Sequence, residues 1–133
     1  MSELNKQLVR RYYEIVMGDL AGIEDIVADG FVDHHFPPTI SPGIAGVKEF
    51  FGQFAPAIFG DMEIRIDWML AEGDMVDCHF ALHAKHTGPF GDVPPKGNAI
   101  ICPAISTFRI VGGKLAEAWE IFDSGDLVRQ MQA

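Results

Sequence analysis

The sequence predicts an α+β fold in which N-terminal helices pack on a curved, mostly antiparallel sheet. Up to residue 60 the hydrophobic residues recur every three or four positions, whereas from residue 61 they alternate with polar ones. The helical segments therefore precede the strands instead of alternating with them, which is typical of α+β domains. A length of 133 residues fits a single domain over residues 1–133.

Helices are expected throughout the first part of the chain. Ser2 can cap the first helix, which ends at Gly18. A short helix is expected over residues 23–28. The next helix covers residues 44–58, where the spacing of the apolar residues places an aromatic ridge on one face, and Gly60 ends it.

Strands and a terminal helix are expected in the second half. Alternating apolar and polar residues predict strands over 62–70, 75–86, 99–110 and 115–122, joined largely at glycine-containing turns. A short helix follows near Gly125. Because consecutive strands joined by tight turns run antiparallel, these segments predict a meandering sheet.

A proline inside the third of these strands indicates where the sheet bends. Pro103 cannot donate a hydrogen bond to a neighbouring strand, so we expect a bulge or a bend there. A bent sheet wrapped over helices forms a cone with an internal cavity, which is where small-molecule chemistry would take place. The aromatic side chains of Phe50, Phe54 and Trp68 would supply apolar lining for it.

The composition excludes several classes of protein. Ten Lys and Arg against nineteen Asp and Glu give a net charge of -9, which argues against nucleic acid or an anionic membrane surface as a partner. No apolar run reaches the roughly 18 residues of a membrane span, and the N-terminus lacks the pattern of a secretory signal. Cys78 and Cys102 fall in apolar strand segments, so reduced core thiols in a cytoplasmic protein are expected.

The five histidines do not form a metal-binding pattern. His79 and His83 would lie about 13 Å apart on a strand, too far for one ion. A metal site would require His34 or His35 to meet His86 across the fold, which is a minor alternative. Neither a glycine-rich nucleotide loop nor a cysteine-rich metal motif occurs, so we expect no metal and no cofactor.

Two carboxylates on the last strand are candidates for chemistry. Alternation places Glu117 and Asp123 on the same face as Trp119 and Ile121, and we expect this face to point toward the core. Burial raises the pKa of a carboxyl toward that of a working base. Asp123 could instead cap the helix that follows it, and Glu117 could instead pair with Arg109 across the hairpin. The sequence leaves both alternatives open.

Three further side chains could contribute to a site. His86 ends the apolar face of its strand and could hold a substrate oxygen or orient a carboxylate. One of the adjacent histidines, His34 or His35, could enter the mouth of the cavity, and the phenol of Tyr12 could reach the cavity from the first helix. Each also has a structural alternative. His86 could bond to the following turn, His34 could bond to backbone carbonyls at a helix end, and Tyr12 could be a core tyrosine.

Several segments together form a recognisable set. They are residues 32–35, 71–74, 86–90, 94–97 and 113–123. In their order and spacing the sequence resembles the SnoaL-like polyketide cyclase family, within the nuclear transport factor 2-like superfamily of α+β cones. The resemblance covers nearly the whole chain.

The resemblance implies an enzyme that uses neither a metal nor an organic cofactor. In such cyclases an acidic residue in the pocket is the general base for an intramolecular aldol ring closure, and the matching position is Asp123. The resemblance also implies that His34 and His86 belong to the pocket and that the protein forms a homodimer through the outer sheet face. Asp92 and Lys96 depart from the usual pattern of the connection at the pocket mouth, so the substrate is not specified.

Catalysis of the lyase or isomerase type is the first hypothesis. Asp123 would remove a proton next to the carbonyl of a hydrophobic substrate, while His86 or His34 held the enolate oxygen, leading to ring closure or isomerisation. The alternatives are non-catalytic binding of a hydrophobic small molecule, epoxide hydrolysis in which Arg109 would pair with the base inside the cavity, and an interaction role of the outer face. The residues expected to contact a substrate are Tyr12, Phe50, Phe54, Trp68, Trp119 and Glu117.

Overall fold

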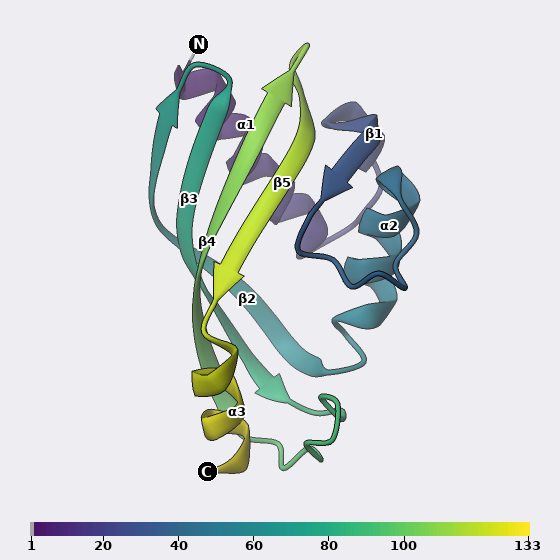
Figure 1. Ribbon diagram of the computed structural model, residues 1–133, viewed down its shortest axis with the longest axis vertical. Coiled ribbons are helices and arrows are strands. Elements are labelled where there is room, and N and C mark those ends of the chain that lie inside the picture. Colours follow the sequence, from purple (N-terminus) through teal and green to yellow (C-terminus); the bar gives the residue numbers. More distant parts are fainter. Residues whose placement is uncertain (1) are drawn as a thin grey trace.

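A computed structural model describes residues 2–133 and shows three α-helices packed on one five-stranded sheet (Figure 1). The strands lie in the order β1-β5-β4-β3-β2. The predicted α+β class is confirmed. In chain order the elements are α1 (Ser2–Val16), a 3-10 turn (Ile23–Asp25), β1 (Val27–Asp33), α2 (Gly43–Glu49), a π-helical turn (Phe50–Phe54), β2 (Phe59–Glu72), β3 (Met75–His86), β4 (Ala99–Val111), β5 (Lys114–Phe122) and α3 (Ser124–Gln132).

Helix α1 covers one face of the sheet, behind the strands in Figure 1, and leaves the other face uncovered within residues 2–133. Its buried side chains, among them Val9 and Tyr12, join the main hydrophobic core with residues of every strand. Strands β2 to β5 form the predicted antiparallel meander. The sheet is mixed because β1 pairs with β5 in the parallel direction.

Strand β1 corrects the prediction of a helix over residues 23–28. Only Ile23–Asp25 are helical, and the chain is extended from Val27 to Asp33. The partner of β1 is β5, which lies more than eighty residues later in the sequence, so local periodicity could not indicate the pairing. The strand ends at Asp33, which borders the cavity between the sheet and the helices.

The predicted helix over 44–58 is shorter and changes pitch. Helix α2 ends at Glu49 and continues as one π-helical turn over Phe50–Phe54. A π-turn shifts the following side chains around the helix axis, and such turns are frequent at functional sites. Here the turn presents Phe50, Phe51 and Phe54 to the internal cavity.

The pairing of β3 with β4 contains no bulge at Pro103, one of the two irregularities that the sequence predicted there. The pairing of β3 with β4 is continuous there, and Pro103 lies opposite Ala81. The pairing of β5 with β4 starts only at Ala104, so no strand on that side requires a backbone N–H from Pro103. The register of the β4–β5 hairpin shifts instead between Arg109 and Ile110.

Helix α3 lies beside the first residues of β4, which β5 does not pair with. The Gln130 side chain accepts a hydrogen bond from the Ile101 N–H (2.8 Å) and donates one to the Ile101 carbonyl (2.8 Å), as a neighbouring strand would. The Asn98 amide donates to the carbonyls at the end of the helix. These contacts hold Leu127 of α3 against a second hydrophobic cluster.

The two cysteines are free and buried, as expected. Burial raises the pKa of the Cys78 thiol to about 12 and that of Cys102 to about 11, so both thiols remain protonated and inert at neutral pH. Over residues 2–133, none of the helices combines the length and the hydrophobicity that a membrane crossing requires.

We expect Gly88→Ala to destabilise the fold. A Cβ at Gly88 would lie 1.7 Å from the carbonyl oxygen of Ala57, so the segment before β2 would have to move. Overpacking of this kind costs about 1 to 3 kcal/mol in free energy of unfolding. Chemical denaturation of this variant and of Gly30→Ala, where a Cβ meets no atom within 4 Å, provides the comparison. Equal losses in the two variants would contradict the explanation.

Candidate functional site

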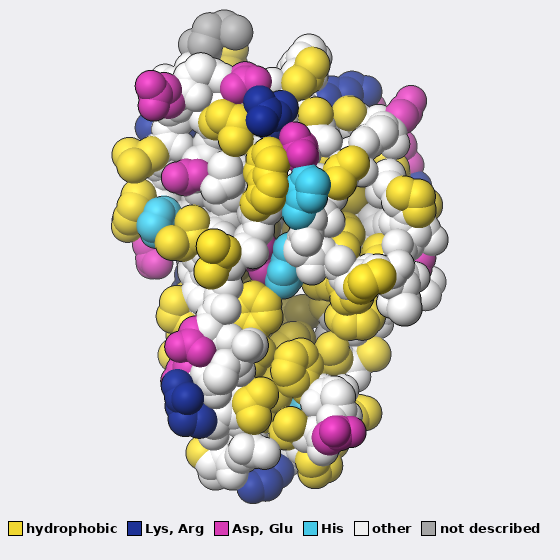
Figure 2. All heavy atoms as spheres, viewed as in Figure 1, with side chains coloured by type: hydrophobic (Ala, Val, Ile, Leu, Met, Phe, Trp, Pro, Cys, Tyr) yellow, Lys and Arg dark blue, Asp and Glu magenta, His cyan; other side chains and the backbone are white. Residues whose placement is uncertain are grey.

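An internal cavity of about 250 Å³ lies between the sheet and the helices. Hydrophobic side chains, many of them aromatic, form most of its wall. Figure 2 views the molecule from the uncovered sheet face and shows a hollow bordered largely by hydrophobic side chains near the centre of this view. The polar members of the lining are Tyr12, Tyr13, Asp33, His35, Ser106 and Glu120. A mostly apolar cavity with a few polar groups is the usual form of a small-molecule site.

The acidic and imidazole groups of the cavity come from the parallel strand pair. Asp33 ends β1, and His35 lies two positions later, in the turn that follows the strand. Glu120 lies on β5, and its Oε2 atom is 2.9 Å from His35 Nε2. The backbone N–H of His35 also donates to the Asp33 carboxylate, at 2.8 Å.

A chain of hydrogen bonds links four of these groups. Tyr13 Oη is 2.7 Å from Ser106 Oγ, and the Ser106 hydroxyl donates to Glu120 Oε1 at 3.1 Å. The other oxygen of Glu120 accepts from His35. Both oxygens of this carboxylate are therefore bonded to protein side chains, and the residues of the chain come from α1, β4, β5 and the segment after β1.

Burial raises the pKa of Asp33 from 3.8 to about 6. The carboxyl lies in the apolar cavity, where its charged form loses hydration. The hydrogen bond from the His35 backbone and the charge of His35 lower the pKa again in part. The outcome is a carboxylate that is largely ionised at neutral pH but holds a proton more strongly than an exposed aspartate.

The pKa of His35 is raised despite its burial. Loss of hydration is the largest single influence and favours the neutral ring, but the hydrogen bond and negative charge of Glu120, together with the charge of Asp33, outweigh it. The site therefore favours an imidazolium between two carboxyl groups.

Tyr12 is the one polar lining residue whose side chain has no hydrogen-bond partner among residues 2–133. Its side chain is 2% exposed and belongs to the cavity lining, and the charges of Asp33 and Glu120 act on its hydroxyl. Burial, with those charges, raises the pKa of Tyr12 well above its usual range, so the hydroxyl keeps its proton. A buried donor without an acceptor costs free energy, and a bound molecule could supply the acceptor.

The prediction of which side chains of β5 point toward the core is wrong. Leu115 is fully buried, but beyond the register shift opposite Arg109 and Ile110 the inward positions are Ala118, Glu120 and Phe122. An extra residue in one strand of a hairpin exchanges the two faces of everything after it. Ile121, expected in the core, is 76% exposed.

The same exchange moves Asp123 away from the cavity. Its side chain is exposed and accepts a hydrogen bond from the backbone N–H of Asp126 at 2.9 Å, which makes it the N-cap of α3. The inward orientation predicted for Asp123 is therefore wrong, and the capping alternative describes its position. The cavity contains Asp33 and Glu120 in its place.

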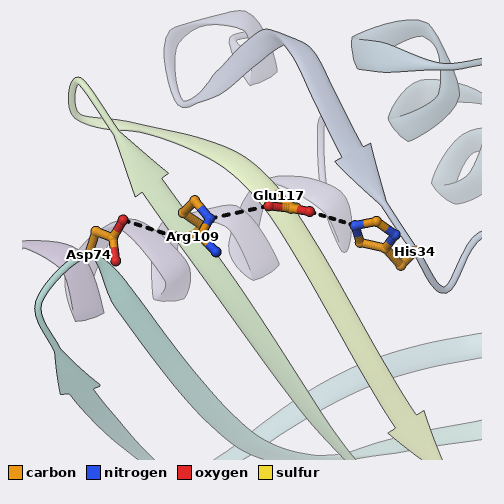
Figure 3. Close-up of polar contacts among 4 residues, drawn as sticks. All are labelled: His34, Asp74, Arg109 and Glu117. Atoms are coloured by element: carbon orange, nitrogen blue, oxygen red, sulfur yellow. Dashed lines mark hydrogen bonds and ion pairs between the residues drawn. The ribbon is translucent and has the colours of Figure 1, made fainter.

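Glu117 and His34 lie outside the cavity, in a polar network on the uncovered sheet face (Figure 3). Arg109 donates to Glu117 at 3.2 Å and to Asp74 at 3.2 Å, and His34 Nε2 lies 2.6 Å from the other Glu117 oxygen. The hydrogen bond with His34, with help from Arg109, lowers the pKa of Glu117. The predicted Glu117–Arg109 pair is confirmed, whereas an arginine inside the cavity is not found.

Of the remaining residues predicted to contact a substrate, some line the cavity and one lies outside it. Phe50 and Phe54 line the cavity as predicted. Trp68 does not, because its ring is 49% exposed and stacks on His79 outside the cavity. Trp119 borders the cavity, while its ring stacks on His34 with centroids 5.1 Å apart.

His86 is fully buried but does not line the cavity. Neither of its ring nitrogens has a hydrogen-bond partner within residues 2–133. The predicted bond from His86 to the following turn is therefore absent, and so is a contact with the acidic groups of the cavity. In the described part of the chain no group of three or more potential ligands is placed to hold a metal ion.

Two of the polar cavity residues could have been identified from the sequence pattern. Ser106 and Glu120 each interrupt a set of alternate apolar residues on their strands, which is the signal of a polar group facing a core. His35 is one of the two adjacent histidines that the sequence offered for the mouth of the cavity. It lies in the turn after β1, where alternation along a strand does not decide the orientation of a side chain.

The fold is an α+β cone that encloses a largely apolar cavity. A family model described as SnoaL-like polyketide cyclase matches residues 6–131. The chain therefore belongs to the SnoaL-like polyketide cyclase family, which has the nuclear transport factor 2-like fold.

Solved structures support the same fold. The chain is similar to TsrD from Streptomyces laurentii, with 21% identity over 98% of this chain and 96% of that one and a TM-score of 0.86. It is similar to IdmH from Streptomyces antibioticus, with 24% identity, coverage of 97% and 99%, and a TM-score of 0.82. A SnoaL-like polyketide cyclase from Agrobacterium tumefaciens is 12% identical, with coverage of 95% and 96% and a TM-score of 0.80. A comparison with curated proteins found no significant match.

We expect Asp33→Asn to stabilise the protein at neutral and alkaline pH. Because the folded-state pKa of Asp33 is raised to about 6, the wild type loses stability as the pH rises from about 4 through about 6, by up to about 3 kcal/mol. The asparagine does not ionise, so its advantage grows over that interval and is absent below about pH 4. Chemical denaturation at pH 4 and pH 8 measures the difference in free energy of unfolding between the variant and the wild type. Asp29→Asn, at an exposed position of the same strand, is the control. A loss of stability at pH 8 would contradict the expectation.

Proposed function

We propose that the protein catalyses cofactor-free acid/base chemistry on a hydrophobic carbonyl compound, with Asp33 as the general base. The observation that supports this best is a carboxyl group with a pKa of about 6 in an apolar cavity. A base with such a pKa is available at neutral pH and accepts a proton more readily than an exposed aspartate. The membership of the polyketide cyclase family favours aldol ring closure or isomerisation as the reaction.

The proton transfers balance within the cavity. The Asp33 carboxylate takes a proton from the carbon next to a carbonyl, and the electron pair of the broken C–H bond forms an enolate. In ring closure the enolate carbon bonds to a second carbonyl carbon, and the resulting alkoxide takes the proton back from Asp33. In isomerisation the proton returns to a different carbon of the same molecule. Neither reaction needs an oxidant or a co-reactant.

Two cavity groups would stabilise the enolate. The unpartnered Tyr12 hydroxyl can donate to its oxygen, because this buried donor has no protein acceptor. His35, kept positive by Glu120, adds a charge of the opposite sign to the developing anion. The phenylalanine side chains of the π-turn would exclude water from the reacting atoms and hold the hydrophobic body of the substrate.

The other hypotheses fit the site less well. Epoxide hydrolysis was expected to require Arg109 inside the cavity, but Arg109 lies on the uncovered face with Glu117 and Asp74. Binding without catalysis would explain the apolar wall, although it leaves no purpose for a desolvated carboxyl group. A test of the proposal must therefore distinguish binding alone from catalysis.

Exchange of the α-hydrogens of 2-tetralone for deuterium, followed by NMR in D₂O, tests the proposal without the natural substrate. Wild-type protein should accelerate the exchange, because it forms the enolate. Asp33→Asn should abolish the acceleration while remaining folded, and Tyr12→Phe should reduce it by about 10 to 100-fold.

Asp123→Asn is the matched control, because it changes a carboxyl that lies outside the cavity. This variant should retain the wild-type exchange rate. Exchange that survives in Asp33→Asn, or disappears in Asp123→Asn, would refute the assignment of the base. Binding of 2-tetralone with no acceleration in the wild type would favour the non-catalytic alternative.

We further propose a homodimer formed through the uncovered sheet face. Trp68, His79, Ile105 and Ile121 are successive partners across four strands and form a continuous row on this face. Ile105 is 41% exposed and Ile121 76% exposed. Contiguous apolar side chains on a sheet are typical of a protein interface.

We also propose a cytoplasmic location, which agrees with the two free, buried cysteines.

Sedimentation velocity tests the homodimer. The wild type should sediment as a dimer, and Ile121→Asp should shift it to the monomer because a charge would be buried at the interface. Leu4→Asp replaces a side chain of α1 that is 64% exposed, away from the sheet face, and should leave the dimer intact. A monomeric wild type would overturn the assignment.

A further inference from the structure

We propose that Tyr13 and Ser106 are positioning residues that act through Glu120 to keep the His35 ring protonated at neutral pH. The inference rests on the proposed function, because a positive His35 matters only if an anion forms in the cavity. Tyr13 and Ser106 would contribute to that function without touching the substrate. The geometry that carries it is the hydrogen-bonded chain Tyr13–Ser106–Glu120–His35.

The direction of the hydrogen bonds in this chain is determined. Ser106 donates its only hydroxyl proton to Glu120 Oε1, so its oxygen must accept the proton of the Tyr13 hydroxyl. Burial raises the pKa of Tyr13 well above its usual range, so the phenol keeps the proton that it donates. Every donor therefore points toward the Glu120 carboxylate, which receives Ser106 on one oxygen and His35 on the other.

Donors pointing at a carboxylate favour its ionised form and fix its orientation. Ser106 is 2% exposed and lies opposite Glu120 in the β4–β5 pairing, so it restrains the carboxylate from a rigid strand. Tyr13, on α1, restrains the serine hydroxyl in turn. A carboxylate held in one orientation is the partner that stabilises the His35 imidazolium at 2.9 Å.

Within residues 2–133, Glu120 is the one charged group at hydrogen-bond distance to the His35 ring. Asp33 on β1 contacts the His35 backbone N–H and acts on the ring through its charge. The rings of Phe50 and Phe122 pack edge-on against the imidazole, with centroids 6.2 and 5.4 Å away. The titratable groups of the other packed elements lie closer to Glu120, whose charge acts on Tyr12 and Tyr13 of α1 and on Cys102 of β4.

NMR titration of the His35 ring in the free protein tests the inference. Ser106→Ala removes the donor to Glu120 and should shift the His35 midpoint to lower pH. Tyr13→Phe should shift it in the same direction by less, because Ser106 remains. Ser106→Thr keeps a hydroxyl at the same position and should restore the wild-type midpoint. The resonance that is missing in His35→Gln identifies the ring.

Ser41→Ala is the matched control, because Ser41 makes the same kind of bond to a glutamate, Glu49, at 2.9 Å on the exposed surface. It should leave the His35 midpoint unchanged. A Ser106→Ala protein that is less stable but titrates like the wild type shows a merely structural role and overturns the proposal, as does an upward shift. If Ser106→Ala does not fold, Tyr13→Phe and Ser106→Thr decide in the same way.

The titration needs no substrate, so its result is independent of the exchange assay. An unchanged midpoint with active wild-type protein would remove Tyr13 and Ser106 from the mechanism but leave Asp33 in it. A lowered midpoint with inactive wild-type protein would keep the positioning role and refute the enolate chemistry. If both hold, the exchange rate of Ser106→Ala should begin to fall at a lower pH than that of the wild type on the alkaline side, where His35 loses its proton. The fall near pH 6 that protonation of Asp33 causes should stay in place.

Discussion

The ion pair between His35 and Glu120 is the interaction on which the interior of this protein depends. Charged groups are costly in an apolar cavity unless they are paired and their remaining hydrogen-bonding positions are occupied. Here Glu120 uses both oxygens, one on His35 and one on Ser106. Because the pair joins β5 to the chain after β1, it also fixes the end of the parallel strand that carries Asp33.

Two histidines that are adjacent in the sequence serve opposite faces of the sheet. His34 meets Glu117 among exposed side chains, whereas His35 meets Glu120 in the cavity. The chemistry of the two pairs differs because the surroundings differ: solvent screens the first pair, and burial strengthens the second while raising the pKa of the neighbouring Asp33. The same pair of residue types is therefore a surface contact on one face and part of a candidate active site on the other.

Family membership and site chemistry support the proposed function in different ways. The family defines the cone and its cavity, and solved structures at 12 to 24% identity share that fold. They do not indicate which carboxyl group performs the chemistry. That choice comes from burial: Asp33 is desolvated inside the cavity, while Asp123 is exposed and bonded to a backbone N–H at the start of α3. A carboxylate that caps a helix in water, outside the cavity, lacks the access to a bound substrate that a general base requires.

The sequence by itself determined the α+β class, the antiparallel meander and most of the aromatic wall of the cavity, because these follow from local periodicity. The tertiary structure alone decided which carboxyls enter the cavity. A register shift in the β4–β5 hairpin turned Glu120 inward and Asp123 outward, and pairing with the distant β5 made residues 27–33 a strand that delivers Asp33. Bulges and pairings between distant segments depend on contacts that leave no period in the sequence, and they select the face on which each side chain lies.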